Sequence, residues 1–274
     1  MMRKEQALKD RLDEIAKQDW KLPTDIDGDT FVDDLLNALA SIDSDLRENA
    51  LTACYYLIEE NGLVSDAKCR LLLLELISER RLLNGLGKAD HDSVFARAFY
   101  VYAIENLIDY NKKVNKRIFT NEEISEAFEA LLTCFNGEID LRDYVPTKGW
   151  AHAVAHYGDN LGTFAEDDAL GHMSLMDILT AIRSKICINH HQYRAGEDRR
   201  LAAVIIKVLE RGLISESEFS DWLVGFLDFD HELNTLHYNC ANFLWSIRFI
   251  LKGELSKVYG KYVSDVTIKL LASA

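Results

Sequence analysis

The chain has 274 residues, of which 48% are hydrophobic, and a formal net charge of −14. A chain of this size can bury a sizeable core. Its acidic balance argues against broad binding to nucleic acid or to an anionic membrane, because both need Lys and Arg to neutralise phosphate. We therefore expect a cytoplasmic protein whose partners include neither nucleic acid nor membrane.

The usage of cysteine and proline indicates the cellular compartment and the fold class of the protein. The five cysteines are scattered without CxxC spacing, which is typical of small buried residues in a reducing compartment. The charged start of the chain does not resemble a signal peptide, and no apolar run approaches membrane-spanning length. Only two prolines occur, Pro23 and Pro146, which favours many helices joined by short turns.

Apolar residues at helical spacing predict a series of helices along the first half of the chain. The first is an amphipathic helix over residues 2–18. Others are expected over 29–39, 43–61, 65–77, 92–108 and 120–132. Thr120 and Glu123 have the spacing of a capping box, which marks the last of these starts. Residues 137–148 are expected to form a loop.

The second half continues the same pattern. A helix over residues 150–164 follows the loop, and Ser215 with Glu218 forms a second capping box. Further helices are expected over 174–186, 197–211, 215–226, 234–251 and 255–271. No segment alternates cleanly with period two, so the evidence for strands is weak. The fold class indicated is all-α.

Three helix starts resemble one another. Residues 43–50, 92–98 and 197–202 each place an acid near the start and an arginine in the first or second turn. This pattern favours a helix-pair repeat of about fifty residues, close to the HEAT/armadillo range. Capping and dipole preferences alone are the alternative explanation. We predict a single domain over residues 1–274, built as an α-solenoid of antiparallel helix pairs.

The most distinctive stretch lies at residues 148–161, which read Lys-Gly-Trp-Ala-His-Ala-Val-Ala-His-Tyr-Gly-Asp-Asn-Leu. Read as a helix, it places His152, His156 and Asp159 at i, i+4 and i+7, on one face. Small residues surround these three, so that other segments can approach closely.

Three segments resemble a bacterial family, domain of unknown function 2785. They are residues 92–99, 148–159 and 197–202, and the resemblance covers about residues 80–225. Members of this family usually have Arg before the Gly-Trp pair and Gly after the second histidine, where this chain has Lys148 and Tyr157. The resemblance implies an all-helical fold and no particular activity.

The two histidines suggest a divalent metal, since His at i and i+4 can bind one ion. The glutamate of an HExxH enzyme is absent, because Ala153 follows His152. The third ligand would come from Asp159, His190 or His191. Asp92 or Asp198 would form hydrogen bonds to the ligands. The alternative is that both imidazoles are buried and hydrogen-bonded to acids or to backbone. No other cofactor is expected.

Arg97 lies in an apolar, aromatic segment, where a buried guanidinium needs an acid partner. Asp92, Asp159 or Asp198 is expected to supply it. The functional interpretation is a polar concave face, and the structural one is a set of ion pairs between repeats. The candidate ligand-binding residues are Asp92, Arg97, Trp150, His152, His156, Asp159, Asp198 and Arg199.

These observations favour a binding scaffold over an enzyme, with a protein segment or a small ligand as its partner. The sequence contains no P-loop, no dinucleotide-binding fingerprint and no GxSxG motif, and it identifies no catalytic residue. The alternative function is a metal-dependent hydrolase that uses His152, His156 and Asp159. The polar loop at 189–196, which carries His190 and His191, is interpreted as solvated, with a flap over the histidine face as its functional alternative.

Overall fold

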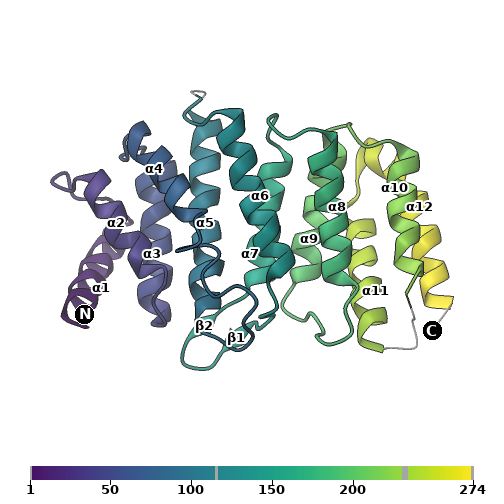
Figure 1. Ribbon diagram of the computed structural model, residues 1–274, viewed down its shortest axis with the longest axis horizontal. Helices are drawn as coiled ribbons and strands as arrows, with labels where there is room; N and C mark the ends of the chain where they lie inside the picture. The colour runs from purple at the N-terminus through teal and green to yellow at the C-terminus, as the bar shows by residue number, and fades with distance from the viewer. Residues whose placement is uncertain (1, 115–116, 230–233, 273–274) are drawn as a thin grey trace. The chain divides into compact units, whose positions relative to one another are not determined.

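The computed structural model of the protein describes residues 2–114, 117–229 and 234–272. Within these residues the chain forms twelve α-helices and one two-stranded antiparallel sheet, so the expected all-α class is confirmed (Figure 1). The packing divides into two compact units, residues 1–160 and residues 161–274. The expectation of one domain over the whole chain stays a prediction.

The first unit is built around α3 and α5. Helix α3 packs against α1, α2 and α5, and a short π-helix at the end of α3 also packs against α5. The elements are α1 (Met2–Lys17), α2 (Gly28–Ala38), α3 (Ser44–Tyr55), the π-helix (Tyr56–Glu60), α4 (Asp66–Leu76), α5 (Ser93–Lys113), α6 (Asn121–Gly137), β1 (Tyr144–Val145), β2 (Gly149–Trp150) and the start of α7 (Ala153–Ala165).

The second unit has α11 at its centre, in contact with α8, α9 and α12. Its core is aromatic: Trp222 packs against Phe219, Phe226 and Phe243, and its indole Nε1 donates a hydrogen bond of 2.7 Å to the carbonyl of Leu179. The elements are α8 (His172–Ile186), α9 (Glu197–Glu210), α10 (Glu216–Val224), a 3-10 helix (Gly225–Leu227), α11 (Asn234–Ile250) and α12 (Gly253–Ala272).

Both predicted capping boxes are present. The Thr120 hydroxyl accepts from the Glu123 amide at 3.2 Å, and the Glu123 carboxylate accepts from the Thr120 amide at 2.8 Å. Ser215 and Glu218 repeat this exchange at 3.2 and 2.9 Å. Each box satisfies two backbone donors that the first helical turn leaves without intrahelical partners.

One prediction about the central stretch was wrong. The helix expected over residues 150–164 begins only at Ala153, and Gly149–Trp150 is instead a strand. Tyr144 pairs with Trp150 and Val145 with Gly149, so part of the expected loop belongs to a short hairpin. The strands are two residues long, too short for an alternating pattern to be visible in the sequence.

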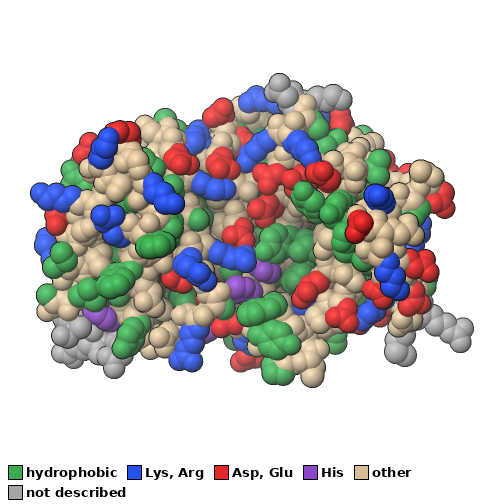
Figure 2. All heavy atoms as spheres, turned by 180° about the vertical axis from the view of Figure 1, so that it is seen from behind, with side chains coloured by type: hydrophobic (Ala, Val, Ile, Leu, Met, Phe, Trp, Pro, Cys, Tyr) green, Lys and Arg blue, Asp and Glu red, His purple; other side chains and the backbone are tan. Residues whose placement is uncertain are grey.

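Cys54, Cys69, Cys134 and Cys240 are buried, as expected, whereas Cys187 is half-buried. The five cysteines are free thiols, and burial raises the pKa of Cys54 and of Cys69 to about 12. On the face seen in Figure 2, acidic and basic side chains are interspersed. Among the helices that the structure describes, none combines the length and the apolar character needed to cross a membrane.

Candidate functional site

Arg47 of α3 forms hydrogen bonds to the backbone of the hairpin that β1 and β2 make. The guanidinium donates to the carbonyl of Lys148 at 2.7 Å and to that of Trp150 at 3.2 Å, and also to the carbonyl of Ser41 at 2.8 Å. Arg47 is completely buried. Three backbone carbonyls from two distant segments therefore converge on one side chain.

Aromatic rings complete the surroundings of this guanidinium. It lies over the ring of Phe95 at 4.5 Å and over that of Phe99 at 4.6 Å, both from α5. In the described part of the chain, no carboxylate forms an ion pair with Arg47. Burial lowers its pKa from the ordinary value. Carbonyl dipoles and the negative ring faces thus stabilise the charge in place of an acid.

Gly149 lets the hairpin lie directly on α3. Its φ is +78°, and a Cβ there would lie 2.7 Å from the Cβ of Ser44 and 3.3 Å from Nη2 of Arg47. Any side chain would therefore push the hairpin away. Next to it, Lys148 forms an ion pair of 2.7 Å with Asp92, which precedes α5. Both side chains are therefore engaged in this ion pair.

His152 lies between the hairpin and α7, with its backbone in the left-handed region at φ +48°. Its amide donates to the carbonyl of Arg142, and its own carbonyl accepts from the amides of Ala155 and His156 at 3.1 and 3.2 Å. It therefore occupies the N-cap position of α7. A residue with a Cβ adopts this conformation at a cost of about 1–2 kcal/mol.

The rings of this region form a continuous series from the surface to the interior. Tyr144 is 58% exposed, and its ring contacts that of Trp150, which is 42% exposed, at 5.4 Å. Trp150 lies 5.2 Å from His152, and His152 lies 5.7 Å from His156. We call these four residues the hairpin aromatic cluster. The two imidazoles are neighbours, as predicted, although only His156 belongs to the helix.

The side chain of His156 forms a hydrogen bond to the backbone of α5. Its Nδ1 donates to the carbonyl of Ala98 at 3.1 Å. One turn later, the side-chain Nδ2 of Asn160 donates to the carbonyl of Val101 at 2.6 Å. Because a carbonyl only accepts, Nδ1 carries a hydrogen in this contact. The ring of His156 also contacts Tyr102 at 4.4 Å. A buried imidazole bonded to backbone matches the structural alternative for this residue.

The metal hypothesis needs a third ligand close to both histidines. Asp159 is half-buried and accepts a long hydrogen bond of 3.5 Å from the Tyr102 hydroxyl. Across the described residues, no set of three His, Cys, Asp or Glu ligand atoms within 4.8 Å of one another includes His156 or Asp159. Among the residues that the structure describes, a three-ligand group that contains both histidines, as the metal hypothesis needs, is therefore not found.

Arg97 has an acid partner, but not one of those expected. Its Nε and Nη2 donate to the two carboxylate oxygens of Glu138 at 2.7 and 2.9 Å, and both side chains are completely buried. Its Nη1 donates to the carbonyl of Asn84 and the hydroxyl of Ser93. The expectation of Asp92, Asp159 or Asp198 as partner was wrong. With its donors used internally, Arg97 is part of the protein interior.

The remaining predicted residues lie in the second unit. The carboxylate of Asp198 accepts from the Ser246 hydroxyl at 2.8 Å, and Arg199 is exposed. In the polar loop, His190 is exposed and His191 is half-buried, with its ring 5.3 Å from that of Tyr193. Burial lowers the pKa of His191.

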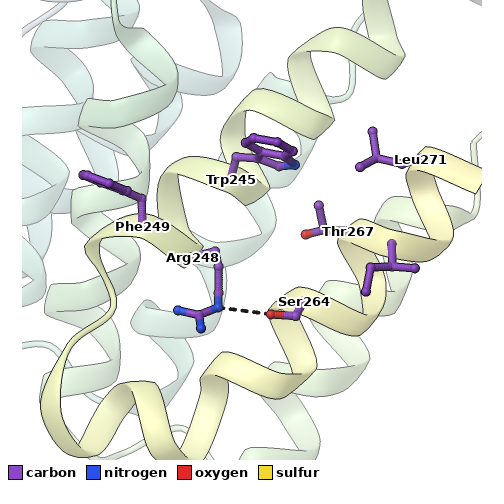
Figure 3. A pocket seen from close by; sticks show the side chains of 7 residues that line it. Trp245, Arg248, Phe249, Ser264, Thr267 and Leu271 are labelled. Atoms are coloured by element: carbon purple, nitrogen blue, oxygen red, sulfur yellow. Dashed lines mark hydrogen bonds between the residues drawn. The ribbon is translucent and has the colours of Figure 1, made fainter.

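A second surface feature lies between α11 and α12. It is a groove of about 540 Å³ with Trp245 and Phe249 projecting from α11 and Leu271 from α12 (Figure 3). Trp245 is 61% exposed and Phe249 is 85% exposed. Arg248 is occupied by a hydrogen bond of 3.1 Å to Ser264. The groove is therefore apolar, and its exposed indole makes a matched control for Trp150.

The left-handed backbone of His152 leads to a prediction about stability. We expect His152→Gly to be more stable than His152→Ala by about 0.5–1 kcal/mol, because glycine adopts positive φ without the steric cost, which outweighs its larger loss of chain entropy. At His156, inside the helix, the order should reverse by about 1 kcal/mol. Urea unfolding of the four variants measures both differences. Alanine equal to or better than glycine at position 152 would contradict the left-handed backbone.

Comparisons with known proteins identify a family. The family described as "Protein of unknown function (DUF2785)" matches residues 82–249, which is more than half of the chain and includes α5, the hairpin and α7. No curated protein and no solved structure matches the chain.

Proposed function

Because the chain belongs to the DUF2785 family, whose description assigns no activity, we propose its function from the site: a non-enzymatic binding module. The hairpin aromatic cluster is its recognition surface, and a protein segment or a small ligand is its partner. We also propose that the helices form a HEAT/armadillo-like stack. The support for that stack is that α3 and α5 both carry a buried arginine near their start, Arg47 and Arg97.

The exposed Tyr144–Trp150 pair is the observation that carries the binding proposal. An exposed aromatic pair leaves apolar surface in water, and such surface is typical of interaction sites. The pair is held by a hairpin whose backbone bonds to Arg47 and whose Lys148 pairs with Asp92. A surface held in one geometry loses little entropy when it binds, which favours affinity.

The chemistry of this surface indicates what it accepts. Trp150 and Tyr144 offer ring faces and edges to an apolar or planar group of the partner. Lys148 and Asp92 are 32% and 43% exposed, so they add one charge of each sign at the rim. The ring of His152, which is only 8% exposed, packs against the buried side of the Trp150 ring.

The test is a binding screen with indole signals as the readout. The purified chain is screened against peptide and small-molecule libraries, and the Nε1–H signal of Trp150 is followed by ¹H–¹⁵N NMR. For a compound that shifts this signal, we expect Trp150→Ala to weaken binding at least tenfold, since an aromatic anchor contributes about 2 kcal/mol. Trp245→Ala removes a more exposed indole from the other unit and should leave the affinity unchanged.

Two results would overturn the binding proposal. One is a set of ligands whose affinity is the same with and without Trp150. The other is substrate turnover by the hydrolase alternative, in which His152, His156 and Asp159 hold a metal. Elemental analysis of protein purified without a histidine tag tests that alternative directly. Near-stoichiometric transition metal that is lost in His156→Ala would favour the hydrolase.

A further inference from the structure

Two cysteine side chains contact each other in the second unit, one at the end of α8 and one in α11. The Sγ atoms of Cys187 and Cys240 lie 3.6 Å apart, although the residues are 53 positions apart in the sequence. The thiols of Cys69 and Cys134 instead donate to backbone carbonyls, at 3.9 and 3.2 Å. Neither Cys187 nor Cys240 belongs to the hairpin aromatic cluster, so their chemistry is independent of the proposed function.

The two thiols differ in their access to solvent. Cys187 is the C-cap residue of α8 and is half-buried, whereas Cys240 is 0% exposed. A small reagent from solution therefore meets Cys187 first, and the thiol already in contact with that sulfur is the one of Cys240. An accessible thiol beside a second thiol is the arrangement in which reversible cysteine oxidation leads to a disulfide.

Hydrogen bonds from Asn239 of α11 keep the two thiols together. Its Nδ2 donates to the carbonyls of Ile188 and His191, at 3.2 and 2.9 Å, and its Oδ1 accepts from the amide of Tyr193 at 3.1 Å. Asn239 is 2% exposed, so these bonds are shielded from water. The segment that follows Cys187 is therefore fastened to α11 at the residue next to its partner cysteine.

We propose that Cys187 and Cys240 form a reversible disulfide by exchange with a low-molecular-weight disulfide such as oxidised glutathione. The Cys187 thiolate attacks one glutathione sulfur, so that a mixed disulfide forms and one glutathione thiolate leaves. The Cys240 thiolate then attacks the Cys187 sulfur and displaces the second glutathione thiolate. Two protein thiols are oxidised and one glutathione disulfide is reduced, and the two thiol protons end on the two glutathione molecules.

The position of Cys187 allows the bond to close. The sulfurs must approach to about 2.0 Å. Cys187 lies at the end of α8, where its amide donates to the carbonyl of Arg183 at 2.9 Å, and the helix does not continue beyond it. A side-chain rotation and a small shift at this end bring the sulfurs together, while Cys240 stays fixed inside α11. The product links α11 covalently to the polar loop that carries His190.

The exchange is slow at neutral pH. The hydrogen bond to Cys240, and then burial, raise the pKa of Cys187, so that only a small fraction of the thiol is ionised and able to attack. The pair therefore responds to sustained oxidising conditions and not to a brief exposure to oxidant.

Peptide mapping tests the bond directly. The purified full chain is incubated with oxidised glutathione, its remaining thiols are alkylated, and its peptides are identified by mass spectrometry. We expect one major cross-linked peptide pair, joined through Cys187 and Cys240, which dithiothreitol separates.

Three variants assign the two steps. Cys240→Ala should stop at the first step and retain glutathione on Cys187. Cys187→Ser should take up no glutathione at Cys240, because the buried thiol is not reached from solution. Cys54→Ala, which removes a buried thiol of the first unit, should form the bond like the native chain. Circular dichroism checks that each variant is folded, and mapping of the native chain does not depend on them.

The fold should favour the disulfide, because it already holds the thiols in contact. In buffers of reduced and oxidised glutathione, we expect the equilibrium constant for the bond to be at least tenfold larger for the folded chain than for chain unfolded in urea. By the same thermodynamic cycle, the oxidised chain should melt at a higher temperature than the reduced chain. Exchange of the Tyr193 amide should slow on oxidation, whereas the Ser215 amide in its capping box should keep its rate.

Any of four results would overturn the proposal. The first is no reaction of the native chain with oxidised glutathione, and the second is glutathione that stays on Cys187 although Cys240 is present. The third is a mixture of disulfides in which other cysteines pair as often. The fourth is an equilibrium constant no larger for the folded chain than for the unfolded one, which would show that the contact between the thiols does not favour the bond.

Discussion

Glu138→Gln should lower the free energy of unfolding by about 3–5 kcal/mol, because it leaves the buried guanidinium of Arg97 without its counter-charge. Burial opposes the charge of Arg97, but hydrogen bonds and attraction to Glu138 outweigh it and raise its pKa above the ordinary value. Arginine does not lose its proton in proteins, so the side chain stays charged in the variant, in a site that water does not reach. Urea unfolding followed by circular dichroism measures the loss.

Two further variants separate charge from packing. In Arg97→Met combined with Glu138→Leu, both charges are gone and the volume is kept, so most of the lost stability should return. Glu60→Gln breaks the exposed ion pair between Glu60 and Lys113, at 2.9 Å, and should leave stability unchanged. Native-like stability of Glu138→Gln would mean that Arg97 and Glu138 do not form a buried pair in solution.

The second large effect is expected at Arg47. Arg47→Met should destabilise the fold by about 3 kcal/mol or more, because three carbonyls lose a charged donor and two aromatic rings lose a cation. The carbonyls of Lys148 and Trp150 are two of these, so the hairpin should loosen as well. Amide hydrogen exchange of residues 143–152 measures this loosening, and any ligand selected through Trp150 should bind more weakly.

The geometry of the guanidinium gives the control for this prediction. Arg47→Lys keeps the charge but offers neither the planar fork nor the stacking, so it should recover only part of the stability. Arg11 also lies over an aromatic ring, that of Phe31 at 4.9 Å, but it is exposed. Arg11→Met should therefore have little effect. Equal effects at the two arginines would show that burial and carbonyl contacts do not set the importance of Arg47.

Short-range sequence signals predicted much of the fold. The capping boxes at Thr120–Glu123 and Ser215–Glu218 involve groups three residues apart, so the chain carries the whole motif locally. Apolar periodicity likewise indicated the helices, because burying one face requires it. The neighbourhood of His152 and His156 was also predicted, although for a helix that begins one residue after His152.

The functional geometry depends on contacts between distant residues. Arg47 bonds to carbonyls about one hundred positions away in the chain. Arg97 pairs with Glu138 and with none of the three aspartates that the sequence suggested as its partner. No local pattern marks Glu138 as different from other glutamates, and the Gly-Trp motif does not indicate what Gly149 packs against. Their roles follow from what packs against them, which is the guanidinium of Arg97 for Glu138 and the side chain of Ser44 for Gly149.

The sequence by itself determined that this protein is helical and acidic and that it carries a Gly-Trp-x-His-x-x-x-His segment. The tertiary structure alone decided that the segment begins as a hairpin, that His152 adopts a left-handed backbone, and that Trp150 faces solvent. The physical reason is range: helix formation depends on neighbours within one or two turns. The choice of partner for a buried charge depends on which segments the whole packing brings together.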